Sequence, residues 1–154
     1  MKYLNNFSLF ESIENKLETL RFVGPRDYFD IYEIAAIDNN DDIIGYSHYI
    51  GVDDESWLSD LLSVKKDYRN NDYPQLALIL RLLTHAVTER IVAKSKDYSA
   101  SGEGFMRKYE KLGYWVFDIG SKKATLTEKG VQTAEEYAKK YMDMQEVDWI
   151  GEIV

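Results

Sequence analysis

Residues 57–74 combine residue types in an order that could hold an anion. An apolar segment over residues 57–64 has the length and composition of a β-strand. A polar turn follows over residues 65–73, and Pro74 then opens a long apolar segment that is typical of a buried helix. The first N–H groups of a helix have no partner within it, so they can donate to a phosphate or a carboxylate. The sequence therefore predicts an anion site where strand, turn and helix meet.

Few side chains are placed for acid–base or nucleophilic chemistry. Asp60 lies on the expected strand, where it is either a general base or a solvent-facing residue of an alternating pattern. His48 and His85 are isolated and lack metal-ligand spacing, so we expect packing or surface roles for both and no metal site. The chain has no cysteine, which excludes disulfides, thiolate metal sites and a cysteine nucleophile. No order of serine, histidine and aspartate indicates a catalytic triad.

Composition limits the class of protein. The chain has 154 residues, 45% of them hydrophobic, and a formal net charge of −8. This length suits one domain with a core, so we predict a single domain over residues 1–154. The acidic charge disfavours nucleic acid and anionic membranes as partners, and fits an amine substrate or a basic protein partner.

Two further patterns bear on where the protein acts. No apolar segment approaches the ~20 residues that a membrane helix needs, and the N-terminus lacks the pattern of a signal peptide. Together with the absence of cysteine, these patterns favour a cytoplasmic protein.

The spacing of apolar and turn residues predicts a mixed α/β order. The expected elements are a helix over 8–20, strands over 28–37, 43–52 and 57–64, a helix over 74–91, a short strand over 91–93, a loop over 99–102, a helix over 103–112, strands over 114–119 and 124–126, and a helix from 128. Gly24 and Pro25 end the first helix, Gly113 caps the third, and Thr125 or Thr127 caps the last. Residues 147–150 either form an edge strand or bind a partner.

Four short motifs occur in an order that resembles the GNAT family of N-acetyltransferases. They are Asp42-Ile43-Ile44-Gly45-Tyr46, Leu62-Ser63-Val64, Asp67-Tyr68-Arg69 and Tyr109-Glu110-Lys111-Leu112-Gly113-Tyr114. In turn they resemble the second strand of the family's central hairpin, the end of its fourth strand, the start of its cofactor loop, and its helix-to-strand junction. The correspondence covers residues 28–126. It implies an α/β (α+β) fold with a central mixed, mostly antiparallel sheet flanked by helices, and an extra C-terminal helix.

The resemblance also implies an acetyl-CoA-dependent N-acetyltransferase, in which a primary amine attacks the thioester directly in a ternary complex. Backbone N–H groups near Val64, on the segment Leu62-Ser63-Val64, would hold the thioester carbonyl, whose oxygen gains charge in the transition state. The pyrophosphate would lie on the turn, at the positions Arg69, Asn70, Asn71, Asp72 and Tyr73. Tyr109 would protonate the departing thiolate, with Asp60 as a candidate base. Without the motif, a tyrosine such as Tyr109 near a helix C-terminus is most often a packing residue.

The cofactor loop departs from the family pattern at two positions. Asp72 stands where the family has glycine, and Pro74 stands where it has glycine or alanine. Asp72 adds a negative charge beside an anion, and Pro74 removes an N–H donor, so both changes weaken the expected binding of CoA.

Other hypotheses therefore remain beside the enzyme. The main alternative is a GNAT-fold protein without catalysis that acts as a protein-binding or regulatory module. The aromatic residues Tyr141 and Trp149 would suit the contact of a homodimer. Residues 125–130 also resemble the end of winged-helix DNA-binding domains, a third hypothesis that the acidic charge opposes.

Overall fold

The computed structural model describes the backbone of residues 21–28, 31–38, 40, 42–65 and 75–143, with the side chains from residue 33 onward except those of residues 60, 61, 142 and 143. The elements follow in the order β1 (Arg21–Tyr28), β2 (Ile31–Ile37), β3 (Ile43–Gly51), β4 (Ser56–Val64), α2 (Leu76–Thr88), β5 (Val92–Ser95), α3 (Ala100–Lys111), β6 (Trp115–Asp118), β7 (Lys123–Leu126), α4 (Glu128–Tyr141) and β8 (Met142–Asp143).

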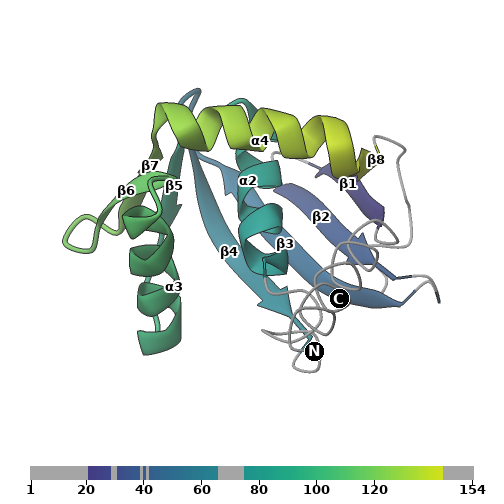
Figure 1. Ribbon diagram of the computed structural model, residues 1–154, viewed down its shortest axis with the longest axis horizontal. Coiled ribbons are helices and arrows are strands. Elements are labelled where there is room, and N and C mark those ends of the chain that lie inside the picture. Colours follow the sequence, from purple (N-terminus) through teal and green to yellow (C-terminus); the bar gives the residue numbers. More distant parts are fainter. Residues whose placement is uncertain (1–20, 29–30, 39, 41, 66–74, 144–154) are drawn as a thin grey trace, which may run out of the picture.

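Within these residues the strands form one eight-stranded sheet in the order β6-β7-β5-β4-β3-β2-β1-β8. The pairs β4–β5 and β1–β8 are parallel, and the other neighbours are antiparallel. Figure 1 shows α2 across the middle of the sheet, α3 beside β5, β6 and β7, and α4 along one end of the sheet from β7 to β8. The expected α/β fold, with a mostly antiparallel sheet and an added C-terminal helix, is confirmed.

The helix α2 is buried over most of its circumference, as its apolar sequence predicts. A Cβ atom at Gly45 on β3 would lie 2.9 Å from Leu80 Cδ1 and 3.3 Å from Leu76 Cδ2, so glycine lets helix and sheet approach closely. One turn further on, the hydroxyls of Ser47 and Thr84 form a buried hydrogen bond of 3.2 Å. These contacts fix which side of α2 faces the sheet.

Local capping rules explain the ends of α3 and α4. Ser99 caps α3 by accepting a hydrogen bond of 3.1 Å from the Gly102 N–H, so the loop expected at 99–102 is instead the cap and first turn of the helix. Gly113 has φ +92° at the C-terminal end, as predicted for a left-handed cap. Thr127 caps α4 by accepting from the Gly130 N–H at 3.1 Å, which confirms one of the two expected caps.

The N-terminal part of the sheet corrects one expectation. Gly24 and Pro25 do not end a helix but lie within β1, where the register against β2 shifts between Val23 and Arg26. A bulge accommodates proline in a strand because the extra residue has no ladder hydrogen bond to make. The helix expected over 8–20 and the segment 147–150 lie outside the described residues.

Candidate active site

The parallel strands β4 and β5 separate in the middle of the sheet. They pair only from Ser56 opposite Val92 to Ser59 opposite Ser95, whereas β4 continues to Val64. On its other side β4 pairs with β3, but His48 is opposite Leu61 and Tyr49 is opposite Ser59. Asp60 is therefore the extra residue of a β-bulge, located where β5 ends. Bulges bend and twist a strand and are common next to active sites.

A cavity of about 230 Å³ lies at this fork. Its lining residues come from the fork itself, from α2, and from the loop and first turns of α3: Ser59, Leu62, Arg81, Ser95, Asp97, Tyr98, Ser99, Gly102, Phe105 and Met106. The lining combines apolar side chains with several hydroxyls, the Asp97 carboxylate and the buried guanidinium of Arg81, which makes this fork cavity a candidate small-molecule site.

Arg81 places a guanidinium in the fork cavity from the buried helix α2. It is 3% exposed, and its Cζ lies 4.8 Å from the centroid of the Trp57 ring. Its Nη2 donates over a long 3.4 Å to Tyr98 Oη and contacts Met106 Sδ at 3.6 Å, while Nε has no hydrogen-bond partner. Burial lowers the pKa of the guanidinium, although Tyr98 counteracts this. An arginine side chain nevertheless stays protonated in proteins.

Two tyrosines lie near the fork, and they differ in access to the cavity. Tyr98 lines it and packs edge-on against Phe117, with ring centroids 5.2 Å apart. Tyr109 is 5% exposed and is not among the lining residues. Its ring packs against those of Phe105 and Trp115, with centroids 5.0 and 6.0 Å away, and burial raises its pKa.

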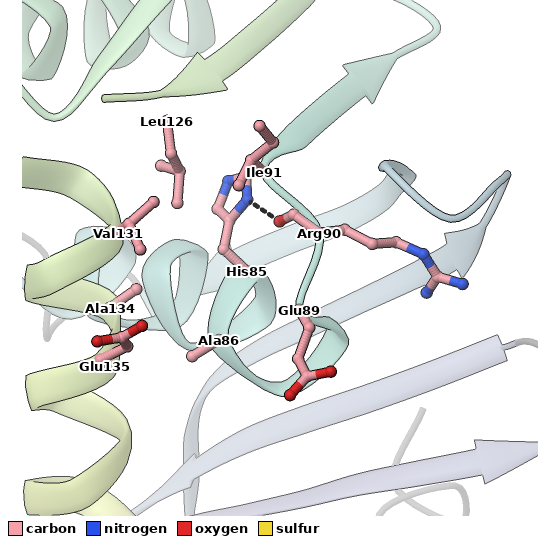
Figure 2. Close-up of a pocket in the computed structure, with 9 residues that line it drawn as sticks. All are labelled: His85, Ala86, Glu89, Arg90, Ile91, Leu126, Val131, Ala134 and Glu135. Carbon is pink, nitrogen blue, oxygen red and sulfur yellow. Dashed lines mark hydrogen bonds between the residues drawn. The ribbon is translucent and has the colours of Figure 1, made fainter. Parts of the chain in front are cut away.

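A second cavity, of about 290 Å³, lies where the C-terminal end of α2 meets α4 (Figure 2). Its lining residues are His85, Ala86, Glu89, Arg90, Ile91, Leu126, Val131, Ala134 and Glu135. Figure 2 shows the guanidinium of Arg90 pointing away from the other lining residues, and its Nε donates to the Asp53 carbonyl at 2.6 Å.

His85 in this second cavity is neutral. Its Nδ1 lies 2.8 Å from the Arg90 carbonyl oxygen, which can only accept, so the proton belongs on Nδ1. The Trp57 indole Nε1 also lies 3.3 Å from Nδ1, a longer contact that competes for the same atom, so we assign the hydrogen bond to Arg90. Nε2 has no partner. Burial, together with the nearby charge of Arg81, lowers the pKa of His85 to about 3.

The structure brings one of the expected cofactor residues into the fork cavity. Leu62 lines it, while Ser63 is exposed on β4 and Val64 is buried with Leu76 and Ile79 at the start of α2. Val64 and the first turn of α2 thus share one hydrophobic cluster, and the anion site expected between them stays a prediction.

Other expected site residues are only partly described. The backbone of Asp60 is at the bulge, and its side chain lies outside the described part of the structure. The positions Arg69, Asn70, Asn71, Asp72 and Tyr73 lie outside the described residues altogether.

Two residues of the fork cavity, Arg81 and Tyr98, were not predicted from the sequence. A signal for Arg81 was present, since it is a single cation in the middle of the apolar run of α2. A cationic side chain at such a position either points to solvent or is buried, and a buried one usually has a partner or a function. Tyr98 had no comparable signal, because its approach to Arg81 depends on where the chain after β5 turns.

The described residues contain neither a membrane-spanning helix nor a metal-binding cluster. No helix among them is long and apolar enough to cross a membrane. Nor do they contain a group of three or more histidine, cysteine, aspartate or glutamate side chains that could hold a metal ion.

Comparison with known proteins gives matches at the level of structure alone. No protein-family profile matches the sequence, and no curated protein does. The chain is similar to the CoA-dependent acyl-homoserine lactone synthase BjaI, whose structure contains SAM and isopentyl-CoA, with 9% identity and a TM-score of 0.52 over 82% of this chain and 76% of that one. At this identity the likeness shows a shared fold, which agrees with the GNAT-like fold that the motifs predict.

Two N-acetyltransferase structures match less well. The PaiA N-acetyltransferase of Thermoplasma acidophilum, in complex with coenzyme A, is 16% identical with a TM-score of 0.48, over 64% of this chain and 62% of that one. A GNAT-family acetyltransferase of Elizabethkingia anophelis with bound acetyl-CoA is 15% identical with a TM-score of 0.43, over 63% of this chain and 74% of that one. The chain thus spans less than two thirds of the length of PaiA.

Proposed function

We propose that the protein is an acyl-CoA-dependent N-acyltransferase that transfers an acetyl group to a primary amine in a ternary complex. The observation that carries this proposal is the fork between β4 and β5, where a bulge at Asp60 adjoins a cavity of about 230 Å³. The fold shared with a CoA-dependent synthase and the four GNAT-like motifs support it. The absence of cysteine is consistent with a reducing compartment such as the cytoplasm.

In the proposed reaction the amine nitrogen attacks the thioester carbonyl carbon, and the carbon–sulfur bond breaks. The amine loses one proton to a base, and the departing CoA thiolate gains one from an acid, so the products are an amide and free CoA. Backbone N–H groups on the edge of β4 near Leu62 and Val64 would stabilise the oxyanion. The start of α2 would face the phosphates of the cofactor, since its first N–H groups have no helical partner.

The proton donor would be a tyrosine, and two are candidates for different reasons. The family resemblance favours Tyr109, and access to the cavity favours Tyr98. Asp60 remains the proposed base because of its position at the bulge.

Thermal unfolding with acetyl-CoA is the first test. A ligand at 100 times its dissociation constant stabilises the folded state by about 2.7 kcal/mol, which raises Tm by roughly 5 to 10 °C for a chain of this size. Desulfo-CoA should give a similar rise, and ATP a smaller one. Free thiol released in the presence of amines then measures transfer. Tyr109→Phe and Tyr98→Phe identify the acid, since the relevant variant should lose kcat about 100-fold or more and keep its response to CoA.

The alternative is a GNAT-fold protein that binds a partner without catalysis. The sequence observation that favours it is the pair Asp72 and Pro74 in the expected phosphate loop. No change in Tm at millimolar acetyl-CoA, and no thiol release with any amine, would favour this alternative over the enzyme.

A further inference from the structure

Within the described part of the chain, Arg81 lacks the anionic partner that a buried cation needs. The hydrogen bonds that the structure gives its guanidinium run through Nη2 alone: one to Tyr98 is long, and one goes to the Met106 sulfur, a weak acceptor. Nε is buried without a partner. No carboxylate pairs with Arg81 among the residues that the structure describes. Because arginine does not lose its proton on burial, its charge stays inside the protein, and none of the described side chains compensates it.

The neighbouring groups do not remove this charge. The Trp57 ring faces the guanidinium at 4.8 Å and stabilises the cation through its π-electrons, but it accepts no hydrogen bond in the guanidinium plane. Asp97 lines the same cavity, yet its Oδ1 accepts the Tyr98 N–H at 2.9 Å and lies 3.9 Å from Lys122 Nζ. The Asp97 side chain is 90% exposed, so it lies at the rim of the cavity.

The position of Arg81 indicates which kind of ligand would pair with its guanidinium. The guanidinium opens into the fork cavity, where the proposed acyl transfer takes place, and Ser59, Ser95 and Ser99 also line the cavity. A guanidinium presents parallel N–H donors that match the two oxygens of a carboxylate. We propose that Arg81 binds a carboxylate of the substrate in the fork cavity, so the preferred reactants carry an acidic group close to the reacting atoms.

This inference rests on the proposed function for its chemistry, and a carboxylate can enter from either reactant. An amino acid acceptor would bring it beside the attacking amine. A dicarboxylic acyl group would bring it at the far end of the acyl chain. In either case one carboxylate lies against Arg81, and transfer assays with charged and neutral reactants distinguish the two cases.

The first experiment measures binding without CoA. Thermal unfolding is recorded in succinate, in its neutral isostere succinamide, and in sodium chloride of matched ionic strength. Succinate at ten times its dissociation constant should raise Tm by about 3 to 5 °C, and succinamide should not. Equal responses to succinate and succinamide would overturn the proposal.

Variants test whether the rise in Tm with succinate depends on Arg81. Arg81→Met should fold, because it replaces an unpaired buried cation with an apolar side chain of similar length, and it should lose the succinate response. Arg107→Met is the matched control, because it removes the same charge from an exposed arginine, and it should respond like the wild type. A succinate response that survives in Arg81→Met would overturn the proposal. If Arg81→Met fails to fold, Arg81→Lys replaces it and should show a weaker response, since lysine cannot bind both oxygens.

The second experiment measures transfer from acetyl-CoA or succinyl-CoA to glycine or glycinamide. If the acceptor carries the carboxylate, Arg81→Met should raise KM for glycine about 10- to 100-fold and leave glycinamide unchanged. If the acyl group carries it, the rise should appear with succinyl-CoA and not with acetyl-CoA.

The two proposals fail in different ways. Transfer that is equal for charged and neutral reactants, and unchanged in Arg81→Met, overturns the carboxylate inference and leaves the acyltransferase standing. No transfer and no CoA binding, with the succinate response intact, overturns the acyltransferase and leaves the carboxylate site standing.

Discussion

Arg81 and His85 lie one helical turn apart on α2, and both are basic side chains buried away from water. Both approach the Trp57 indole, Arg81 with its Cζ at 4.8 Å from the ring centroid and His85 with ring centroids 5.1 Å apart. Each also lines a cavity, Arg81 at the fork of β4 and β5 and His85 between α2 and α4. Arg81 is charged in its cavity, whereas His85 is neutral.

The difference follows from the chemistry of the two side chains. Burial disfavours the charged form of both. Histidine responds by losing its proton, which costs little near neutral pH, whereas arginine keeps its proton at any physiological pH. The retained charge on Arg81 then lowers the pKa of His85 further. The buried charge therefore persists on Arg81, which has no accessible neutral form, and is lost from His85, so Arg81 is the one of the two that indicates an anionic ligand.

Removal of the Trp57 indole, which contacts both Arg81 and His85, should have the largest effect on the stability of the protein. Trp57 is 1% exposed and lies among the core residues of α2 and β3. Trp57→Ala should lower the free energy of unfolding by about 3 to 5 kcal/mol, because it opens a large cavity and removes the ring that both Arg81 and His85 contact. Urea denaturation measures the loss. Trp57→Phe keeps an aromatic face and should lose less, and a loss below about 1 kcal/mol in Trp57→Ala would show that the indole does not hold this region together.

Acid should destabilise the His85 region specifically. An unfolded histidine takes up a proton near pH 6.5, whereas folded His85 does so only near pH 3. Between these values the unfolded state binds more protons, so the stability that neutral His85 permits is lost as pH falls from 6.5 toward 3.

The comparison of wild type with His85→Asn isolates this effect. From pH 7.5 to 4.5 the wild type should lose about 2 to 3 kcal/mol more than the variant, because carboxylates contribute equally to both proteins. Asparagine can keep the hydrogen bond to the Arg90 carbonyl. Identical pH dependence in the two proteins would mean that folding does not lower the pKa of His85.

Replacing an exposed arginine should change the stability of the protein least. Arg107 pairs with Glu103 one turn away on α3 at 2.9 Å, and its side chain is 49% exposed. Arg107→Ala should lower the free energy of unfolding by about 0.5 kcal/mol or less, since exposed pairs gain little in water. Denaturation at low and high salt checks this, and a loss above about 1.5 kcal/mol would point to the Phe117 ring contact instead.

Local patterns were enough to predict much of the fold. Aromatic and β-branched composition, with turn residues between, placed the hairpin of β2 and β3 and the strand β4. The left-handed cap at Gly113, and Thr127 as one of two candidate caps, were identified from residue type. These features depend on neighbours within a few residues, which a sequence displays directly. The strand β1 was missed because Gly24 and Pro25 are typical of a break, and only pairing with β2 makes a bulge favourable there.

The sequence by itself determined that α2 is a buried helix, that β4 precedes it, and that their junction resembles a cofactor site. Only the tertiary structure decided which side chains of α2 meet a cavity. A helix that is apolar on nearly every side gives no periodic signal for its orientation, and that orientation is set here by the close approach to Gly45 and by the crossover that makes β4 and β5 parallel. The burial of Arg81 at the fork follows from these long-range contacts, because the residues that meet there are far apart along the chain.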